Sequence, residues 1–377
     1  MNGSSSMKTA LVHHWLVTPR GGEKVFSALA DLFPHADLFA LLCQRSRMKI
    51  LLGERPVHTS VIQFLPRATS WYRYYLPFFP MATERLDLSD YSVVISSDAA
   101  TVKGVHTSSG ALHICYCHTP MRYVWHNYED YSHAAGPIGR FVYPTVSAKL
   151  RDWDFQAAQK VTHFIASSHN VACRIQRYYH RESTVIYPPV DTDYFHPDST
   201  PAADEFFLAV SAHVPYKRLD LAIEAFNRNG KQLIVIGDGS ERRRLEHQAR
   251  PNIRFLGSQP ATVLRCAMQR CRALVFPGEE DFGIVMVEAQ ACGKPVIAFG
   301  QGGACEIVNN GITGVLFEKK TPDSLCDAVR RFGNMRFDPH AIRASALRFD
   351  LTRFRREFSQ FVESAVKSAF SKQPCAS

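Results

Sequence analysis

The sequence predicts an α/β protein with two doubly wound domains, each built on a parallel sheet. Short, nearly continuous apolar runs alternate with longer segments of helical spacing, and the alternation starts again at residue 205. Apolar runs of this kind are typical of parallel strands that helices cover on both faces. The chain has 377 residues, of which 46% are hydrophobic, so it can bury two cores of ordinary size.

The first series begins with an apolar run at residues 9–14. A helix is predicted over residues 21–33, because its apolar residues fall on one side. Those residues are Val25, Phe26, Leu29, Leu32 and Phe33. Further strands are predicted at residues 91–97, 112–118 and 163–168.

The second series has the same order of strand and helix. Its strands are predicted at residues 205–211, 231–239, 252–257, 272–277, 294–299 and 314–318. Helices are predicted at residues 218–229 and 284–293, and Gly293 closes the second of these. Strands that alternate with helices in this way indicate parallel pairing.

A segment rich in Pro, Asp, Ser and Thr separates the two series, and Pro188 and Pro189 stiffen the chain there. We therefore expect an N-terminal domain over residues 7–188 and a second domain over residues 189–350. Residues 351–377 are predicted to form a helix whose apolar face packs back on the first domain. Ligands of such sheets bind beyond the carboxyl ends of the strands, so an interdomain cleft is the expected site.

Composition narrows the class of protein. The net charge of +9 favours anionic partners, such as phosphorylated molecules, nucleic acid or an acidic membrane surface. The ten cysteines form no CxxC pair, which indicates a reducing compartment without disulfides or zinc. No apolar run reaches the length of a membrane-spanning helix, and the opening "MNGSSSM" is unlike a secretory signal, so Met7 is the expected functional start.

Two carboxylates stand out in "PGEEDFGIVMVEAQACGKP". Glu280 follows a predicted buried strand and Glu288 comes eight residues later. If most of the interval is helical, it rises about 12 Å and leaves both side chains on one side, a span that suits a nucleotide sugar. The backbone amides of Phe282, Gly283 and Ile284 would lie near its diphosphate. The alternative is a capping acid at Glu280 and an exposed helix acid at Glu288.

Positive groups and glycines follow other strands. Lys217 and Arg218 come after the strand at 205–211, where a phosphate clamp or a solvated helix start would fit. Gly21 and Gly22 lie between the first strand and the first helix, where backbone can approach phosphate. His118 ends a strand and can donate to a sugar hydroxyl or assist proton movement, although a lone histidine is often structural.

Gly302 and Gly303 form a second glycine-rich turn that we expect near the ligand, whereas Gly237 and Gly239 fit plain turns equally well. The acid pairs at residues 152–154 and 191–193 are interpreted as a helix surface and a linker, so no metal site is predicted.

Residues 63–86 interleave aromatic and basic side chains. Such a segment can lie in a membrane interface, stack on RNA bases or cover the core. No RNA-binding motif accompanies it, which disfavours a nucleic-acid partner.

Taken together, these motifs resemble the family 4 glycosyltransferases of GT-B architecture over nearly the whole chain. The motifs are "GGEKV", "CHTPMRYVW", "YPPVDTDYF", "VPYKRLDLAIEAF", "GEEDFGIVMVEAQACGKPVIAF" and "GGACEIVNNGITGVLF". The resemblance implies retaining, metal-independent transfer of a sugar from a nucleotide diphosphate sugar, without a cofactor and without a protein nucleophile. It also implies that residues 7–188 form the acceptor-side domain and residues 189–350 the nucleotide-sugar donor domain.

The same resemblance implies a role for each site residue. Glu280 would contact the donor sugar and Glu288 the ribose, while Lys217 would contact the diphosphate. Gly21 and Gly22 would contact the phosphates, and His118 would lie near the reacting carbon. One position departs from the family pattern, because Ala212 stands where an arginine is usual. Either Arg218 or His213 then replaces that cation, or the enzyme is slow or inactive.

The residues of these motifs are similar to those of the family branch that builds bacterial exopolysaccharide and O-antigen, often with mannose donors. It implies hexose transfer to a polyprenyl-diphosphate-linked glycan at the inner face of the cytoplasmic membrane, by a cytoplasmic, peripheral protein. A catalytically weak nucleotide-sugar-binding protein or partner subunit is the alternative, and an epimerase or phosphorylase on a related fold is a third.

Overall fold

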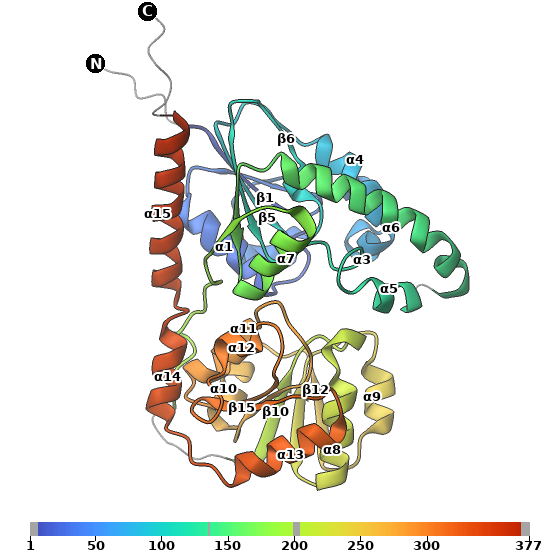
Figure 1. Ribbon diagram of the computed structural model, residues 1–377, viewed down its shortest axis with the longest axis vertical. Coiled ribbons are helices and arrows are strands. Elements are labelled where there is room, and N and C mark those ends of the chain that lie inside the picture. The colour runs from blue at the N-terminus through green and yellow to red at the C-terminus, as the bar shows by residue number, and fades with distance from the viewer. Residues whose placement is uncertain (1–6, 135, 199–203, 371–377) are drawn as a thin grey trace, which may run out of the picture. The chain divides into compact units, whose positions relative to one another are not determined.

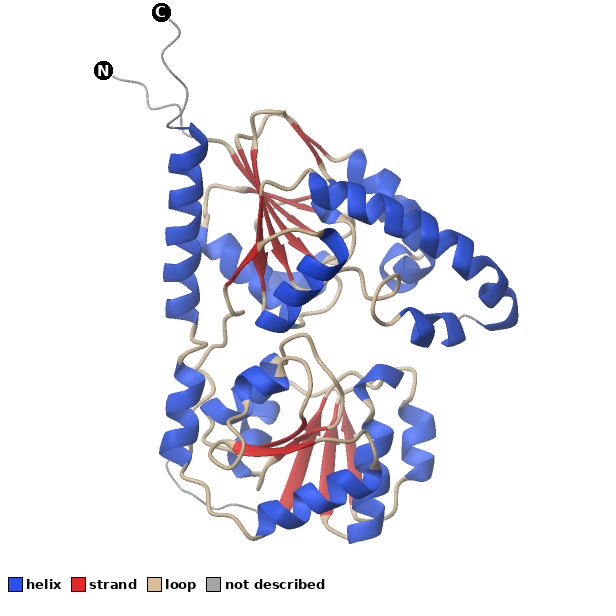
Figure 2. Ribbon diagram, viewed as in Figure 1, coloured by secondary structure: helices blue, strands red, loops and turns tan. Residues whose placement is uncertain are grey.

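The structure is a computed structural model that describes residues 7–134, 136–198 and 204–370. The chain divides into two compact units (Figure 1). Unit 1 holds the described residues up to Pro189 together with those from Phe354 onward, and unit 2 is Val190–Arg353. Each unit contains a parallel sheet with helices against it (Figure 2).

The sheet of unit 1 has seven strands in the order β3-β2-β1-β5-β7-β8-β9, and every pairing is parallel. The strands are β1 (Thr9–His13), β2 (Asp37–Ala40), β3 (Val57–Thr59), β5 (Val93–Asp98), β7 (Leu112–Cys117), β8 (His163–Ala166) and β9 (Ser183–Val185). The four strands expected from the sequence are confirmed. Strands β2, β3 and β9 were not predicted from the sequence.

Helices cover both faces of this sheet, as the alternation of side chains along β7 shows. Cys115 and Cys117 pack in one cluster with Tyr179 of α7 (His169–Tyr179). Tyr116 lies between them in sequence and therefore points to the other face. There it contacts Phe354 and Phe358 of α15 (Leu351–Phe370), with ring centroids 6.0 and 6.2 Å apart. The closing helix thus packs on unit 1.

The remaining elements of unit 1 surround the sheet. They are α1 (Gly21–Leu32), α2 (Arg45–Leu52), η1 (Val61–Phe64), α3 (Ala68–Trp71), η2 (Tyr72–Phe78), α4 (Phe79–Glu84), β4 (Asp87–Leu88), η3 (Val102–Gly104), β6 (His106–Thr107), α5 (Tyr128–Ala134) and α6 (Gly136–Gln159). Within the described ranges, no helix is both long enough and apolar enough to cross a membrane.

The sheet of unit 2 has six parallel strands in the order β12-β11-β10-β13-β14-β15. They are β10 (Phe206–Val210), β11 (Gln232–Ile236), β12 (Ile253–Gly257), β13 (Leu274–Phe276), β14 (Val296–Phe299) and β15 (Gly314–Phe317), and each was expected from the sequence. Its helical elements are η4 (Pro215–Lys217), α8 (Leu219–Asn229), α9 (Arg242–Gln248), α10 (Ala261–Arg270), α11 (Ile284–Ala291), α12 (Ala304–Ile307), α13 (Pro322–Gly333) and α14 (Pro339–Leu347).

Both sheets reverse their strand order at one point. In unit 1 the reversal lies between β1 and β5, and in unit 2 it lies between β10 and β13. In doubly wound sheets the segments that leave the two strands at this point diverge, which opens a crevice at the carboxyl ends. The residues that follow these four strands are therefore the first candidates for a site.

Candidate functional site

Lys217 and Glu280 meet at the reversal point of unit 2. Lys217 lies in the short helical turn η4 after β10, and Glu280 lies in the loop after β13. The Nζ atom of Lys217 forms an ion pair with Oε1 of Glu280, and the side chains are 15% and 11% exposed. Limited exposure reduces solvent screening, so a charged ligand oxygen placed here would feel this pair strongly. The structure thus brings two of the predicted site residues together.

Helix α11 begins at Ile284, where the sequence predicted it, and Gly283 precedes it with a φ of 100°, a left-handed conformation that suits glycine. Glu280 forms an isolated β-bridge with Gly302. Residues 280–283 are therefore not helical, and the estimated rise of about 12 Å, which assumed that most of the interval is helical, does not hold for them. Glu288 lies on α11 and is only 5% exposed, so the alternative of an exposed helix acid is wrong as well.

The turn at Gly302 and Gly303 packs tightly under the loop that carries Glu280. The amide of Gly303 donates to the carbonyl oxygen of Glu280 at 2.8 Å. A Cβ atom on Gly302 would lie 2.4 Å from the same oxygen, and one on Gly303 would lie 2.1 Å from the carbonyl oxygen of Phe282. Both positions therefore require glycine. Phe282 itself is buried, with its ring edge against Phe349 at 5.3 Å, so only its backbone can face a ligand.

Arg218 and His213 were considered as substitutes for the arginine that Ala212 replaces. Arg218 is bound to another carboxylate, and His213 is buried. The guanidinium of Arg218 binds the Asp220 carboxylate, with nitrogen–oxygen distances of 3.0 and 3.1 Å. His213 is fully buried, and that burial lowers the pKa of its imidazole. Neutral His213 therefore does not replace the positive charge of the missing arginine. Lys217 is the positively charged residue that pairs with Glu280.

Gly21 and Gly22 form the first turn of α1 in unit 1, at the start of the helix that was predicted over residues 21–33. The amides of a first turn have no partner within the helix and are suited to anions. A Cβ atom on Gly22 would lie 3.6 Å from Cε1 of His13 and 3.8 Å from Nε2 of His118. The structure therefore places Gly22 beside the predicted His118.

Three histidines gather where β1, β5 and β7 end. Ser97 Oγ lies 3.0 Å from Nδ1 of His13 and 2.8 Å from Nε2 of His118. His14 donates from Nδ1 to the carbonyl oxygen of Ser97 at 3.3 Å. Burial lowers the pKa of His13 well below its usual value and lowers that of His14 to about 4, so both are neutral at pH 7.

His13, His14 and Ser97 were not predicted as site residues from the sequence. Two adjacent histidines at the end of a predicted strand were the available signal, but Ser97 is 84 residues from His13 in the chain. Only the pairing of β1 with β5 brings them together.

Glu23 is a further carboxylate at the start of α1. Its Oε2 accepts a hydrogen bond from the amide of Arg20 at 3.2 Å. Burial raises the pKa of Glu23 to about 7. A carboxyl group with this pKa can exchange a proton near neutral pH, which makes Glu23 a titratable neighbour of Gly22.

A buried charge network lies beneath this cluster. Lys103 forms ion pairs with Asp98, at 3.0 Å, and with Asp154. Asp154 also accepts hydrogen bonds from Trp125 at 2.8 Å and Tyr179 at 2.7 Å. Asp154 belongs to the acid pair at 152–154, so its carboxylate is part of the core rather than of a helix surface as expected.

Asp191, in the other acid pair, accepts a hydrogen bond from the amide of Tyr194 at 2.8 Å and so stabilises a turn. Over the part of the chain that the structure describes, no group of three His, Cys, Asp or Glu side chains has an arrangement that could hold a metal ion.

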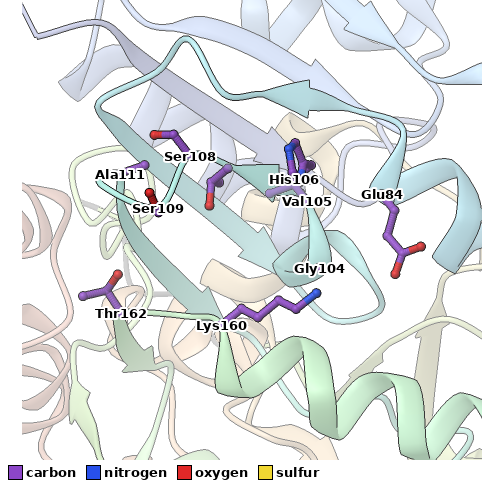
Figure 3. Close-up of a pocket in the computed structure, with 10 residues that line it drawn as sticks. Glu84, Gly104, Val105, His106, Ser108, Ser109, Ala111, Lys160 and Thr162 are labelled. Carbon is purple, nitrogen blue, oxygen red and sulfur yellow. The ribbon is translucent and has the colours of Figure 1, made fainter.

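A pocket of about 620 Å³ lies elsewhere in unit 1 (Figure 3). Its lining includes Glu84, His106, Lys160 and Thr162. These residues precede or flank the amino ends of β7 and β8, which is the opposite end of the sheet from His118. The pocket contains none of the predicted site residues.

Most of the second unit matches the model of a known protein family. Residues 192–348 match the family model described as glycosyl transferases group 1. An uncharacterized glycosyltransferase of Methanocaldococcus jannaschii is 38% identical over 129 residues, which is 33% of this chain and 37% of that protein. A D-inositol 3-phosphate glycosyltransferase of Mycobacterium tuberculosis is 32% identical over 166 residues, 38% of this chain and 35% of that protein. The chain thus spans little more than a third of the length of these curated relatives.

Solved structures match almost the whole chain at low identity. Anabaena HepE in complex with UDP and glucose has a TM-score of 0.67 at 16% identity, covering 95% of this chain and 100% of that one. Sucrose-phosphate synthase of Thermosynechococcus elongatus has a TM-score of 0.68 at 17% identity, with the same coverage. The chain therefore has the GT-B fold, and its residues 192–348 are similar to the glycosyl transferases group 1 family.

Proposed function

We propose that the protein is a retaining glycosyltransferase that moves a hexose from a nucleotide diphosphate sugar, with GDP-mannose as the preferred donor, to a lipid-linked oligosaccharide in surface or exopolysaccharide synthesis. The observation that carries the proposal is the Lys217–Glu280 ion pair at the reversal point of unit 2, within the segment that matches the family model. Anabaena HepE, which has a similar fold, was solved with UDP-glucose, so UDP is the competing nucleotide.

Different residues of unit 2 bind different parts of the nucleotide sugar in this proposal. Lys217 binds the diphosphate and Glu280 accepts hydroxyl hydrogens of the sugar, so the ligand takes over both partners of the present ion pair. Glu288 binds the ribose, and the amides of Gly283 and Ile284 face the diphosphate.

In unit 1, the first-turn amides of Gly21 and Gly22 bind phosphate oxygens and His118 donates to the sugar. Transfer is metal-independent in this proposal, and catalysis rests on positioning and on stabilisation of the leaving diphosphate.

A second candidate function is a nucleotide-sugar-binding protein or partner subunit with weak catalysis. Ala212 supplies no charge, His213 is buried and neutral, and Arg218 is bound to Asp220. Less positive charge at the leaving group lowers the rate of transfer more than it lowers affinity.

We also propose that the aromatic segment, Phe64–Phe79, contacts the membrane that carries the acceptor, at its cytoplasmic face. Phe64 and Tyr74 are 84% and 81% exposed, and Trp71 and Phe78 are about half exposed. Arg67 lies 4.8 Å from the Trp71 ring, so basic and aromatic groups occur together, as in interfacial segments. Tyr72, Tyr75 and Phe79 pack against the core, so the segment also has the covering role that we considered.

The test is thermal stabilisation by GDP, UDP, dTDP and ADP, followed by their sugar derivatives and by transfer assays. The proposal expects a rise in melting temperature with GDP and GDP-mannose, loss of transfer in Glu280→Ala and weaker nucleotide binding in Glu288→Ala. Glu279→Gln is the matched control, because that neighbouring carboxylate pairs with Lys320 instead. Full transfer by Glu280→Ala would contradict the proposal, and binding without transfer by the unchanged protein would favour the second candidate.

A further inference from the structure

Ser97 stands between two imidazole rings at the carboxyl end of β5. Its Oγ atom is 3.0 Å from Nδ1 of His13 and 2.8 Å from Nε2 of His118, and Ser97 is fully buried. A serine hydroxyl carries one proton, so it donates to only one of two neutral rings. The other ring must then donate to it. The three groups are therefore coupled, and the proton position on one ring determines the position on the other.

When both rings are neutral, two proton arrangements satisfy these contacts. In the first, His13 donates from Nδ1 to Ser97, and Ser97 donates to Nε2 of His118. In the second, both hydrogen bonds run the other way, which leaves an N–H group at Nε2 of His13. Among the described residues nothing hydrogen-bonds that buried nitrogen. A buried N–H group without a partner is rarer in proteins than a buried acceptor without one, so the first arrangement is favoured.

The surroundings keep His13 neutral, which the first arrangement requires. His13 is fully buried between His14, whose ring centroid is 4.1 Å away, and Phe26, at 5.1 Å. Its pKa is lowered by this burial and by the neighbouring His14 and His118. The hydrogen bond of His14 goes to the carbonyl oxygen of Ser97, so it does not compete for the hydroxyl.

We propose that Ser97 is a positioning residue that fixes His118 in one ring orientation as the Nδ1-protonated tautomer, with His13 completing the chain of hydrogen bonds. The inference rests on the proposed function for the role of His118. In that tautomer Nε2 accepts from Ser97 and the only ring proton is on Nδ1. His118 then acts at the sugar as a hydrogen-bond donor through Nδ1 and not as a base.

The first measurement is the tautomer of His118 in the full-length protein, from its two ring nitrogen shifts in a ¹⁵N-histidine sample at pH 7.5. We expect the Nδ1–H form in the unchanged protein and a mixture of both forms in Ser97→Ala. Transfer by Ser97→Ala should fall about tenfold or more in kcat, with the donor KM within about twofold, because a misoriented donor costs mainly in the transition state.

Ser96→Ala is the matched control. Ser96 is the adjacent residue on β5, is equally buried and also holds an imidazole, that of His113, at 2.8 Å. The Ser96→Ala substitution should leave both the His118 tautomer and kcat unchanged. If Ser97→Ala does not fold, His13→Phe tests the same chain, since it keeps an aromatic ring against Phe26 and should also mix the tautomers.

An Nε2–H form of His118 in the unchanged protein would overturn the proposal, as would an unchanged tautomer in Ser97→Ala. If Ser96→Ala lost as much kcat as Ser97→Ala, the loss would reflect general damage to β5. That result would also overturn the proposal. Absence of transfer by the unchanged protein would contradict the proposed function, while the tautomer measurement would still decide the role of Ser97.

Discussion

Lys217 is the residue on which the proposed nucleotide binding depends most. Replacing it with alanine removes a charge-assisted contact to the diphosphate and removes the ion pair with Glu280. Such a contact contributes about 1.5–3 kcal/mol, so GDP or UDP affinity should fall about tenfold to a hundredfold. Titration calorimetry of nucleoside diphosphate and of nucleoside separates this effect, because the nucleoside should bind equally to both proteins.

Lys231→Ala provides the control for that measurement, since Lys231 is an exposed lysine at the start of β11. Unchanged diphosphate affinity in Lys217→Ala, with Lys231→Ala also unchanged, would remove Lys217 from the site.

Buried histidines predict how stability depends on pH. Burial lowers the pKa of His14 and of His113 to about 4, below the ordinary value of 6.5. Between these values each ring binds more protons in the unfolded chain than in the folded protein, so the contribution of these rings to the free energy of unfolding decreases as pH falls from about 6.5 to 4. Each such group contributes a slope of at most about 1.4 kcal/mol per pH unit.

Thermal unfolding between pH 7.5 and 4.5 measures this slope. His113→Gln should reduce it, whereas His340→Gln should not, because His340 is exposed on α14. An equal slope in His113→Gln and in the unchanged protein would show that the buried ring of His113 accepts a proton without cost.

At the scale of elements, the sequence predicted most of the strands that are buried on both faces, although β2, which is also buried, was not predicted. The runs that became β1, β10 and β13 are almost wholly apolar, and parallel strands in a covered sheet require this. β3 and β9 have only three residues each, and both are only partly buried, so periodicity does not reveal them. Their pairing depends on the neighbouring strand rather than on their own composition.

The candidate site was predictable where residues adjoin a strand end, as Lys217, Glu280 and His118 do. It was not predictable where partners come from different strands. The chain of His13, Ser97 and His118 depends on the register that pairs His13 with Ser97 and Ser97 with Tyr116. A shift of one residue would turn these side chains to the opposite face of the sheet.

Helix α15 provides an element-scale prediction. Phe358 is fully buried and contacts Phe33, Tyr116 and Phe354, with ring centroids 5.6–6.2 Å apart. Phe358→Ala should lower the free energy of unfolding by about 3–5 kcal/mol, because it removes buried surface and leaves a cavity. Ser364→Ala, at an exposed position of the same helix, should change it by less than about 0.5 kcal/mol in denaturant titration. A small effect of Phe358→Ala would mean that the helix contributes little to the core of unit 1.

The aromatic segment, Phe64–Phe79, gives a second prediction at this scale. Replacing Trp71, Tyr74 and Phe78 with serine removes exposed aromatic surface but leaves the inward residues Tyr72, Tyr75 and Phe79 unchanged. Cosedimentation with vesicles containing phosphatidylglycerol should fall about tenfold or more, because each ring contributes interfacial binding energy. Replacement of the exposed Ile50 on α2 with serine should not alter it. Unchanged vesicle binding by the folded triple variant would contradict the membrane proposal.

In the whole molecule, the hydrophobic clusters of the two units are separate, so a ligand bound to unit 2 stabilises that unit locally. The cluster that contains Phe207, Phe226 and Phe332 belongs to unit 2, whereas those that contain Phe79 and Phe164 belong to unit 1. Openings of unit 2 that break the nucleotide site are therefore opposed by the ligand according to its concentration and affinity.

Hydrogen exchange of the full-length protein, measured by mass spectrometry with and without GDP or UDP, tests this whole-molecule prediction. At a ligand concentration 100 times the dissociation constant, openings that release the ligand cost about 2.7 kcal/mol more, so exchange through them slows about a hundredfold. We expect this in the segments after β10 and β13, at residues 214–218 and 278–284. Peptides that cover residues 104–111, which line the pocket of Figure 3, provide the internal comparison and should exchange at unchanged rates. Protection confined to residues 104–111 would instead assign the nucleotide to that pocket and contradict a site at Lys217 and Glu280.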